Sequence, residues 1–177
     1  IFYNVYECGE ADEETATKDV DTSAAGANVF IVNNTENTVN GSYVARIYKS
    51  VELSEDGKTI IGVRNNNITQ VTIPDCVSII GKKAFCGCYA LQRIEIPNRV
   101  TNIGDSAFSY CSSLRTIEIS NSVTIIEDNA FSWCEALKSI DFPSNVTKIG
   151  NNVFEGCHAL KSINVSDDNK HYTSSDG

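Results

Sequence analysis

The sequence of 177 residues predicts an α/β solenoid preceded by an N-terminal β-hairpin cap. Three columns of residues recur every 23 positions without an insertion: Phe85, Phe108, Phe131 and Phe154; Cys88, Cys111, Cys134 and Cys157; Leu91, Leu114, Leu137 and Leu160. A fixed period of about 20–50 residues is typical of solenoids, in which each unit buries its apolar face by stacking on the next. A solenoid usually works through a shaped surface, so we look for exposed columns before a catalytic pocket.

The chain divides into three predicted parts. Residues 1–26 hold seven acidic residues against Lys18, a local charge of -6, and are expected to be a weakly ordered leader. Residues 27–67 are rich in Val, Ile and Tyr and form either a β-rich cap or the remnant of an upstream domain. Asn40-Gly41 predicts one hairpin turn, and Asp56-Gly57 predicts another between Val51–Leu53 and Thr59–Val63. A hairpin here could cover the open first strand of the solenoid.

Residues 68–177 form the predicted array, with four full units and a partial fifth. In residues 91–113, three apolar residues point inward from a short strand, namely Leu91, Ile94 and Ile96, while Arg93 and Glu95 alternate outward. Pro97 ends that strand and Gly104 allows a tight turn. Apolar residues then follow at helical spacing: Ala107, Phe108, Cys111 and Leu114. Each unit is therefore predicted as a strand, a turn, a second extended piece and one or two helical turns.

Seven cysteines raise the question of disulfides or a metal. Four of them belong to the cysteine column, where each is expected to be a small buried hydrophobe. A zinc site is the weaker alternative, because zinc needs tetrahedral ligands and a column is linear. The state of Cys8, Cys76 and Cys86 is left open, and no metal or cofactor is expected.

Composition and motifs exclude several classes of function. The net charge is -9, and no basic patch is present that could track a phosphate backbone, which argues against nucleic-acid binding. No apolar stretch is long enough to cross a membrane. His158 and His171 have no catalytic partners, and no nucleophile, zinc-protease or phosphate-loop motif occurs. An enzyme is not expected, and no catalytic residue is assigned.

Two exposed surfaces are candidates for binding. Outward strand positions carry charges in columns, which include Arg93, Glu95, Arg115, Glu118, Lys138 and Asp141. They indicate either a recognition face or a solvated surface whose charges screen one another. Tyr110 and Trp133 share a column with Gly87 and Gly156, and they indicate either a binding hot spot or a shield over neighbouring backbone.

The recurring pattern Leu-x-x-Ile-x-Ile-Pro-x-x-Val-x-x-Ile-Gly-x-x-Ala-Phe-x-x-Cys resembles the BspA-like (treponemal-type) leucine-rich repeats, from residue 68 to about 166. Glu127 replaces the turn glycine of one unit. The resemblance implies a right-handed superhelix with parallel strands on one face and short helical turns opposite. It also implies a secreted or cell-surface protein, usually bacterial, that adheres to host, matrix or neighbouring-cell proteins. We expect the protein to be monomeric. The alternative is a passive spacer that projects another domain.

Overall fold

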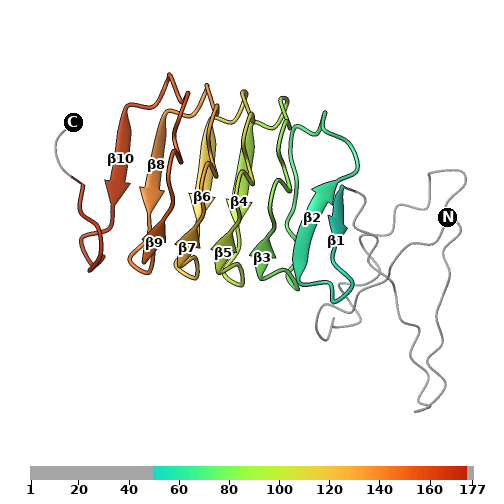
Figure 1. The fold of residues 1–177 in the computed structure, drawn as a ribbon, viewed down its shortest axis with the longest axis horizontal. Coiled ribbons are helices and arrows are strands. Elements are labelled where there is room, and N and C mark those ends of the chain that lie inside the picture. Colours follow the sequence, from blue (N-terminus) through green and yellow to red (C-terminus); the bar gives the residue numbers. More distant parts are fainter. Residues whose placement is uncertain (1–49, 175–177) are drawn as a thin grey trace, which may run out of the picture.

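The computed structural model describes residues 50–174, which wind into a solenoid of stacked coils (Figure 1). One side is a six-stranded sheet in the order β1-β2-β3-β5-β7-β9. Its strands are β1 (Val51–Leu53), β2 (Thr59–Val63), β3 (Ile79–Ile80), β5 (Asn102–Ile103), β7 (Ile125–Ile126) and β9 (Lys148–Ile149). From β2 onward the neighbours are parallel, as expected when each coil adds one strand to the sheet.

A second row of strands holds the charged columns. It comprises β4 (Arg93–Ile96), β6 (Thr116–Ile119), β8 (Ser139–Phe142) and β10 (Ser162–Val165). β4 pairs with β6, and β8 pairs with β10, in parallel and with partners 23 residues apart, such as Glu95 with Glu118. β6 also lies against β8, so the row continues along the axis (Figure 1). The predicted parallel stacking of strands is therefore confirmed.

The predicted hairpin around Asp56-Gly57 is present, and β1 runs antiparallel to β2. Asp56 Oδ1 accepts hydrogen bonds from Ser54 Oγ at 2.6 Å and Lys58 N at 3.0 Å, while Gly57 adopts a φ of 70°. β2 then pairs in parallel with β3, so the hairpin lies at the N-terminal end of the sheet (Figure 1). That residues 27–67 work as a cap stays a prediction, because the leader and the Asn40-Gly41 hairpin lie outside the described residues.

The short helical turns predicted opposite the strands do not form between residues 50 and 174. Residues at alternate positions donate hydrogen bonds to the next coil instead: Phe85 N to Ala107 O at 2.8 Å, and Phe108 N to Ala130 O at 2.8 Å. The amides between them close tight turns within the coil, as in Ala107 N to Gly104 O at 3.1 Å. A continuous helix is impossible here, because left-handed residues interrupt every segment. Apolar residues at offsets of one, four and seven face the core both in a helix and in this series of tight turns. The spacing alone therefore does not distinguish the two.

The core is built from the columns seen in the sequence. Phe85, Phe108 and Phe131 are fully buried, and their rings stack with centroids 5.1 and 5.5 Å apart. Phe154 continues this column at 6.0 Å but is only half-buried. The isoleucine, valine and leucine columns surround the rings. The side chains left on the surface are therefore arranged in columns too.

Candidate functional site

Outward residues of β4, β6, β8 and β10 form a charged surface, which we call the strand face. Arg93 Nη2 and Glu118 Oε1 form an ion pair of 2.6 Å between adjacent strands. Asp141 Oδ1 accepts a hydrogen bond of 2.6 Å from Asn164 Nδ2. Glu95 is exposed and faces Glu118 across the strand pair. Because the Arg93–Glu118 pair is solvent-exposed, it contributes at most about 1 kcal/mol to stability.

Arg115 and Lys138, the other predicted residues of this surface, occupy the corner where the chain enters β6 and β8. Both are exposed, and neither forms an ion pair within the described part of the chain. They therefore form a column separate from the Arg93–Glu118 pair. The charged residues predicted as one surface therefore divide into two parts: the strand residues that include the Arg93–Glu118 ion pair, and the unpaired basic column of Arg115 and Lys138.

The predicted aromatic pair is brought together. The rings of Tyr110 and Trp133 stack with centroids 6.0 Å apart and planes within 6°. His158 packs edge-on against Trp133, also at 6.0 Å. We call Tyr110, Trp133 and His158 the aromatic ledge. Tyr110 is 48% exposed and Trp133 is half-buried.

The ledge lies at a backbone position that favours glycine. Tyr110 and Trp133 have φ values of 61° and 60°, and their column mates Gly87 and Gly156 both have a φ of 73°. A bulky residue in this left-handed region is uncommon and strained, at a cost of about 1–2 kcal/mol. Trp133 also covers Gly156, since a Cβ there would lie 2.6 Å from its ring. Trp133 therefore shields neighbouring backbone, as one interpretation proposed, while Tyr110 leaves much of its ring in water.

Our sequence reasoning missed His158 as a member of the ledge, because it was tested only for catalytic partners. It also missed Tyr89, which is 60% exposed and whose ring lies over Gly87. The available signal was that one column holds glycine in its outer coils and aromatic residues in the coils between them. A missing side chain in one coil leaves space that an aromatic from another column can cover.

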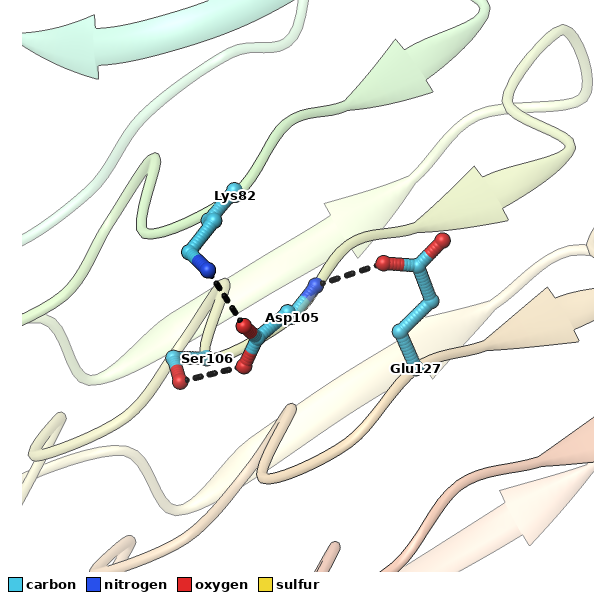
Figure 2. A network of polar contacts seen from close by, with 4 residues as sticks. All are labelled: Lys82, Asp105, Ser106 and Glu127. Atoms are coloured by element: carbon cyan, nitrogen blue, oxygen red, sulfur yellow. Dashed lines mark hydrogen bonds and ion pairs between the residues drawn. The ribbon is translucent and has the colours of Figure 1, made fainter.

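A polar network links three coils at the turn that follows the six-stranded sheet (Figure 2). Lys82 Nζ lies 2.8 Å from Asp105 Oδ2, and Ser106 Oγ donates to Asp105 Oδ1 at 2.7 Å. Asp105 N donates to Glu127 Oε2 at 3.0 Å. The hydrogen bond from Lys82, with that from Ser106, lowers the pKa of Asp105 below its usual value. Glu127, which replaces the repeat glycine, thus ties its coil to the preceding one, and every member of the network has a structural partner.

The cysteine column is buried at Cys88, Cys111 and Cys134 and half-buried at Cys157, and these four are free thiols. Thiols donate to carbonyl oxygens of the phenylalanine column in the preceding coil, as from Cys111 Sγ to Phe85 O at 3.2 Å. Burial raises the pKa of Cys134, which keeps its thiol protonated. These groups are packing elements, since a nucleophile needs access and a thiolate. Cys86 is also a free thiol.

Within residues 50–174, no three His, Cys, Asp or Glu side chains are grouped so that they could hold a metal ion. The same residues include no helix with the length and hydropathy of a membrane span.

Comparison with known proteins gives a consistent result. The family described as "BspA type Leucine rich repeat region" matches residues 63–175 with six copies. A leucine rich cell surface protein from Faecalibacterium prausnitzii A2-165 is similar in structure, with 34% identity and a TM-score of 0.51 over 63% of this chain and 36% of that chain. A leucine-rich repeat protein from Bacteroides capillosus ATCC 29799 has 28% identity and a TM-score of 0.59, over 69% and 97% of the two chains.

The pneumococcal vaccine antigen PcpA is also similar, with 26% identity and a TM-score of 0.54 over 75% of this chain and 38% of that chain. The matched part thus spans little more than a third of the Faecalibacterium protein and of PcpA. No curated protein sequence matches this chain. The family match covers most of the chain, and the Bacteroides neighbour is itself named a leucine-rich repeat protein. The chain therefore belongs to the BspA-type leucine-rich repeat family.

Proposed function

We propose that this protein is a non-enzymatic extracellular recognition module, which binds proteins of a host, a matrix or a neighbouring cell through its repeat surface. Leucine-rich repeat proteins commonly mediate protein interactions, and one structural relative is named as a cell surface protein. A bacterial cell surface is the location that this relationship favours. The proposal assigns contact to the aromatic ledge first and to the strand face second.

The observation that carries the proposal is the strained, exposed position of the ledge. Two of the four coils have glycine at this position, and glycine adopts its φ without steric cost. Tyr110 and Trp133 hold the same conformation with large side chains, and Tyr110 remains 48% exposed. Residues held in strained backbone conformations cluster at functional sites. Tyr and Trp are also the residues most enriched in binding hot spots.

The strand face supports the proposal in a different way. One of its outward columns is acidic, with Glu95, Glu118 and Asp141, and Arg93 already pairs with Glu118 across strands. Electrostatic complementarity of this kind contributes to partner selection and to the association rate more than to affinity. We therefore expect the ledge to govern dissociation and the strand face to govern association.

A passive spacer is the second candidate, and the links between coils favour it. The network of Lys82, Asp105, Ser106 and Glu127 spans three coils, and hydrogen bonds between coils continue along the array (Figure 2). Such links would also suit a stalk that binds nothing. The two functions differ in whether the surface gives saturable binding.

The test is a binding screen of the protein against extracellular matrix proteins and intact partner cells. The double variant Tyr110→Gly/Trp133→Gly removes both rings and suits the left-handed backbone, so it should fold and lose binding. Ile61→Ser, which changes a 55% exposed residue on β2, is the matched control and should bind normally. No saturable binding by the unmodified protein would support the spacer. Full binding by the double variant would move the site away from the ledge.

Charge reversal tests the strand face separately. Glu95→Lys combined with Glu118→Lys reverses two exposed acids on adjacent strands without altering the core. The association rate should change, and the effect should shrink as salt screens the charges. An unchanged association rate at low salt for every partner would exclude this face.

A further inference from the structure

We propose that this protein has a second, separate binding site, a row of cation–hydroxyl pairs that takes a linear anionic polysaccharide. The row is formed by three dipeptides in successive coils: Arg115-Thr116, Lys138-Ser139 and Lys161-Ser162. The ligand is a narrow polymer that carries a carboxylate or sulfate on successive sugars. This site goes beyond the protein-binding function proposed above, because it takes another class of partner and its cations lie at the corner beside the strand face, away from the column of Glu95, Glu118 and Asp141.

The backbone holds the three cations in line. Each begins the segment that leads into a strand; two of the three segments are hydrogen-bonded to a neighbouring coil at this position, and β6 lies against β8 between them. Arg115 N donates to Gln92 O at 2.9 Å, and Lys161 N donates to Lys138 O at 2.9 Å. Because parallel strands lie about 4.8 Å apart, the row of three cations extends over about 10 Å along the solenoid axis.

The charges of the row are uncompensated. Arg115, Lys138 and Lys161 are all exposed, and the two ion pairs found between residues 50 and 174 involve other cations, Lys82 and Arg93. Like charges on adjacent strands repel one another and destabilise the sheet. The acids three residues further along have partners by contrast: Glu118 pairs with Arg93, and Asp141 accepts from Asn164. An external anion is the missing partner of the basic row.

The hydroxyls beside these cations are also unengaged. Thr116 and Ser139 are exposed and Ser162 is half-buried, and their side chains form no hydrogen bond with the described residues. Each coil therefore presents one cation and one hydroxyl at the same height. A ligand with an anionic group and hydroxyls on every repeating unit matches this pattern.

Spacing argues against an extended acidic peptide as the ligand. Side chains on one face of an extended peptide recur about every 6.6 Å, because each residue rises about 3.3 Å and alternate residues point away. That interval does not match rows about 4.8 Å apart. The column of Glu95, Glu118 and Asp141 lies about 10 Å along the strands from the row, so a wide polyanion such as a nucleic-acid duplex would meet repulsion.

Fluorescence titration of the whole protein tests the site with defined polymers. Heparin supplies sulfates, polygalacturonate supplies carboxylates, neutral dextran lacks charge, and poly-glutamate represents an acidic peptide. We expect at least one of the two anionic polysaccharides to bind, and its affinity should fall about tenfold or more between 0.05 and 0.5 M salt, because the charges are exposed and screened. Binding of heparin would identify the anionic group as a sulfate, and binding of polygalacturonate would identify it as a carboxylate.

Matched triple variants locate the site. Arg115→Gln/Lys138→Gln/Lys161→Gln should lose about tenfold or more in affinity, since three charge-assisted contacts are removed. Arg99→Gln/Lys148→Gln/Lys170→Gln removes the same charge from exposed positions elsewhere and should change affinity by less than about threefold. Arg115→Lys keeps the charge and should keep most of the binding. Circular dichroism checks that each variant folds. If the triple variant does not fold, the single variant Lys138→Gln replaces it and should weaken binding by about threefold.

Several results would overturn the site: no binding of either anionic polysaccharide, equal binding of dextran, an equal loss in the control triple variant, or tighter binding of poly-glutamate. Tighter binding of poly-glutamate would reassign the row to an acidic peptide. These outcomes are distinct from failure of the proposed protein recognition, because the ledge variants keep all three cations.

Discussion

Truncation of Phe108 to alanine is the perturbation that most clearly separates stacked coils from a looser array. The ring is fully buried between two others, with centroids 5.1 Å from Phe85 and 5.5 Å from Phe131. Loss of a buried phenylalanine costs about 3–5 kcal/mol, and each stacked aromatic pair contributes about 0.5–1.5 kcal/mol beyond its buried area. We therefore expect a loss near the upper end, about 4–5 kcal/mol.

Phe154→Ala is the matched variant within the same column. Phe154 is half-buried and has Phe131 as its only column neighbour within the described residues, at 6.0 Å. The cost should be smaller, about 2 kcal/mol, because less apolar surface is removed from water. Interior coils share two interfaces with their neighbours, so Phe108→Ala should also loosen the coils on either side.

Urea unfolding measures both losses. Trp133, the single tryptophan, reports on the next coil by fluorescence, and far-UV circular dichroism reports on the whole array. With a slope of about 2 kcal/mol per M, a loss of 4 kcal/mol lowers the midpoint by about 2 M. Equal losses for the two variants, or a loss below about 1 kcal/mol for Phe108→Ala, would refute the stacked register.

Three further predictions concern the turns, the polar network and the thiols. Gly104→Ala should destabilise the protein by more than about 1 kcal/mol, because the new Cβ would lie 2.9 Å from backbone atoms of Gly81, Ile80 and Lys82. Gly62→Ala should be tolerated, since the nearest neighbour of its Cβ is a flexible Glu52 side chain at 3.5 Å. Similar urea midpoints for the two variants would contradict the close approach of the coils. Because the folded-state pKa of Asp105 lies below its ordinary value of 3.8, the ionised carboxylate stabilises the fold above that pH, and this contribution is lost as pH falls through the lower folded value. The difference in unfolding free energy between the native protein and Asp105→Asn should therefore shrink from about pH 5 to about pH 3, and a constant difference would contradict the role of Lys82 in Figure 2. Iodoacetamide should label half-buried Cys86 before the fully buried Cys111 and Cys134, which should react only on unfolding; peptide mapping checks the order, and early labelling of Cys134 would show that the core is open.

Much of this architecture could be predicted from the sequence, because a period is a global signal. Residues 23 apart lie side by side in the structure, so Phe85, Phe108 and Phe131 could be assigned to one buried stack without coordinates. The hairpin around Asp56-Gly57 was equally accessible, because its turn chemistry is local.

The predicted helical turns failed for a physical reason. Apolar spacing reports which residues face the core, and it does not report where their amides donate. Phe85 N and Phe108 N donate to the next coil, so the segments form turns and links between coils instead of a helix. Left-handed residues such as Lys83 and Ser106, each with a φ of 57°, make this possible and carry no distinctive sequence signal.

The candidate surfaces were only partly predictable. Columns placed Arg93 and Glu118 on adjacent strands, and Tyr110 next to Trp133. Which charges pair depends on side-chain reach across the diagonal, and the period does not encode it. Arg93 thus engages Glu118, while Arg115 and Lys138 have no ion-pair partner within residues 50–174.

All the proposed surfaces depend on one claim, that residues 23 positions apart lie directly opposite on neighbouring strands. Disulfide formation between introduced cysteines tests it. Ser139 faces Ser162 in the β8–β10 pair, where a parallel partner lies about 4.8 Å away, within the range that a disulfide can bridge. Asn164 is two residues further along β10, which places it about 8 Å from Ser139 and beyond that range. The variant Ser139→Cys/Ser162→Cys should therefore form the crosslink readily under mild oxidation, and Ser139→Cys/Asn164→Cys should not. Preferential crosslinking of the second pair, detected by peptide mapping, would contradict the register and the surfaces built on it.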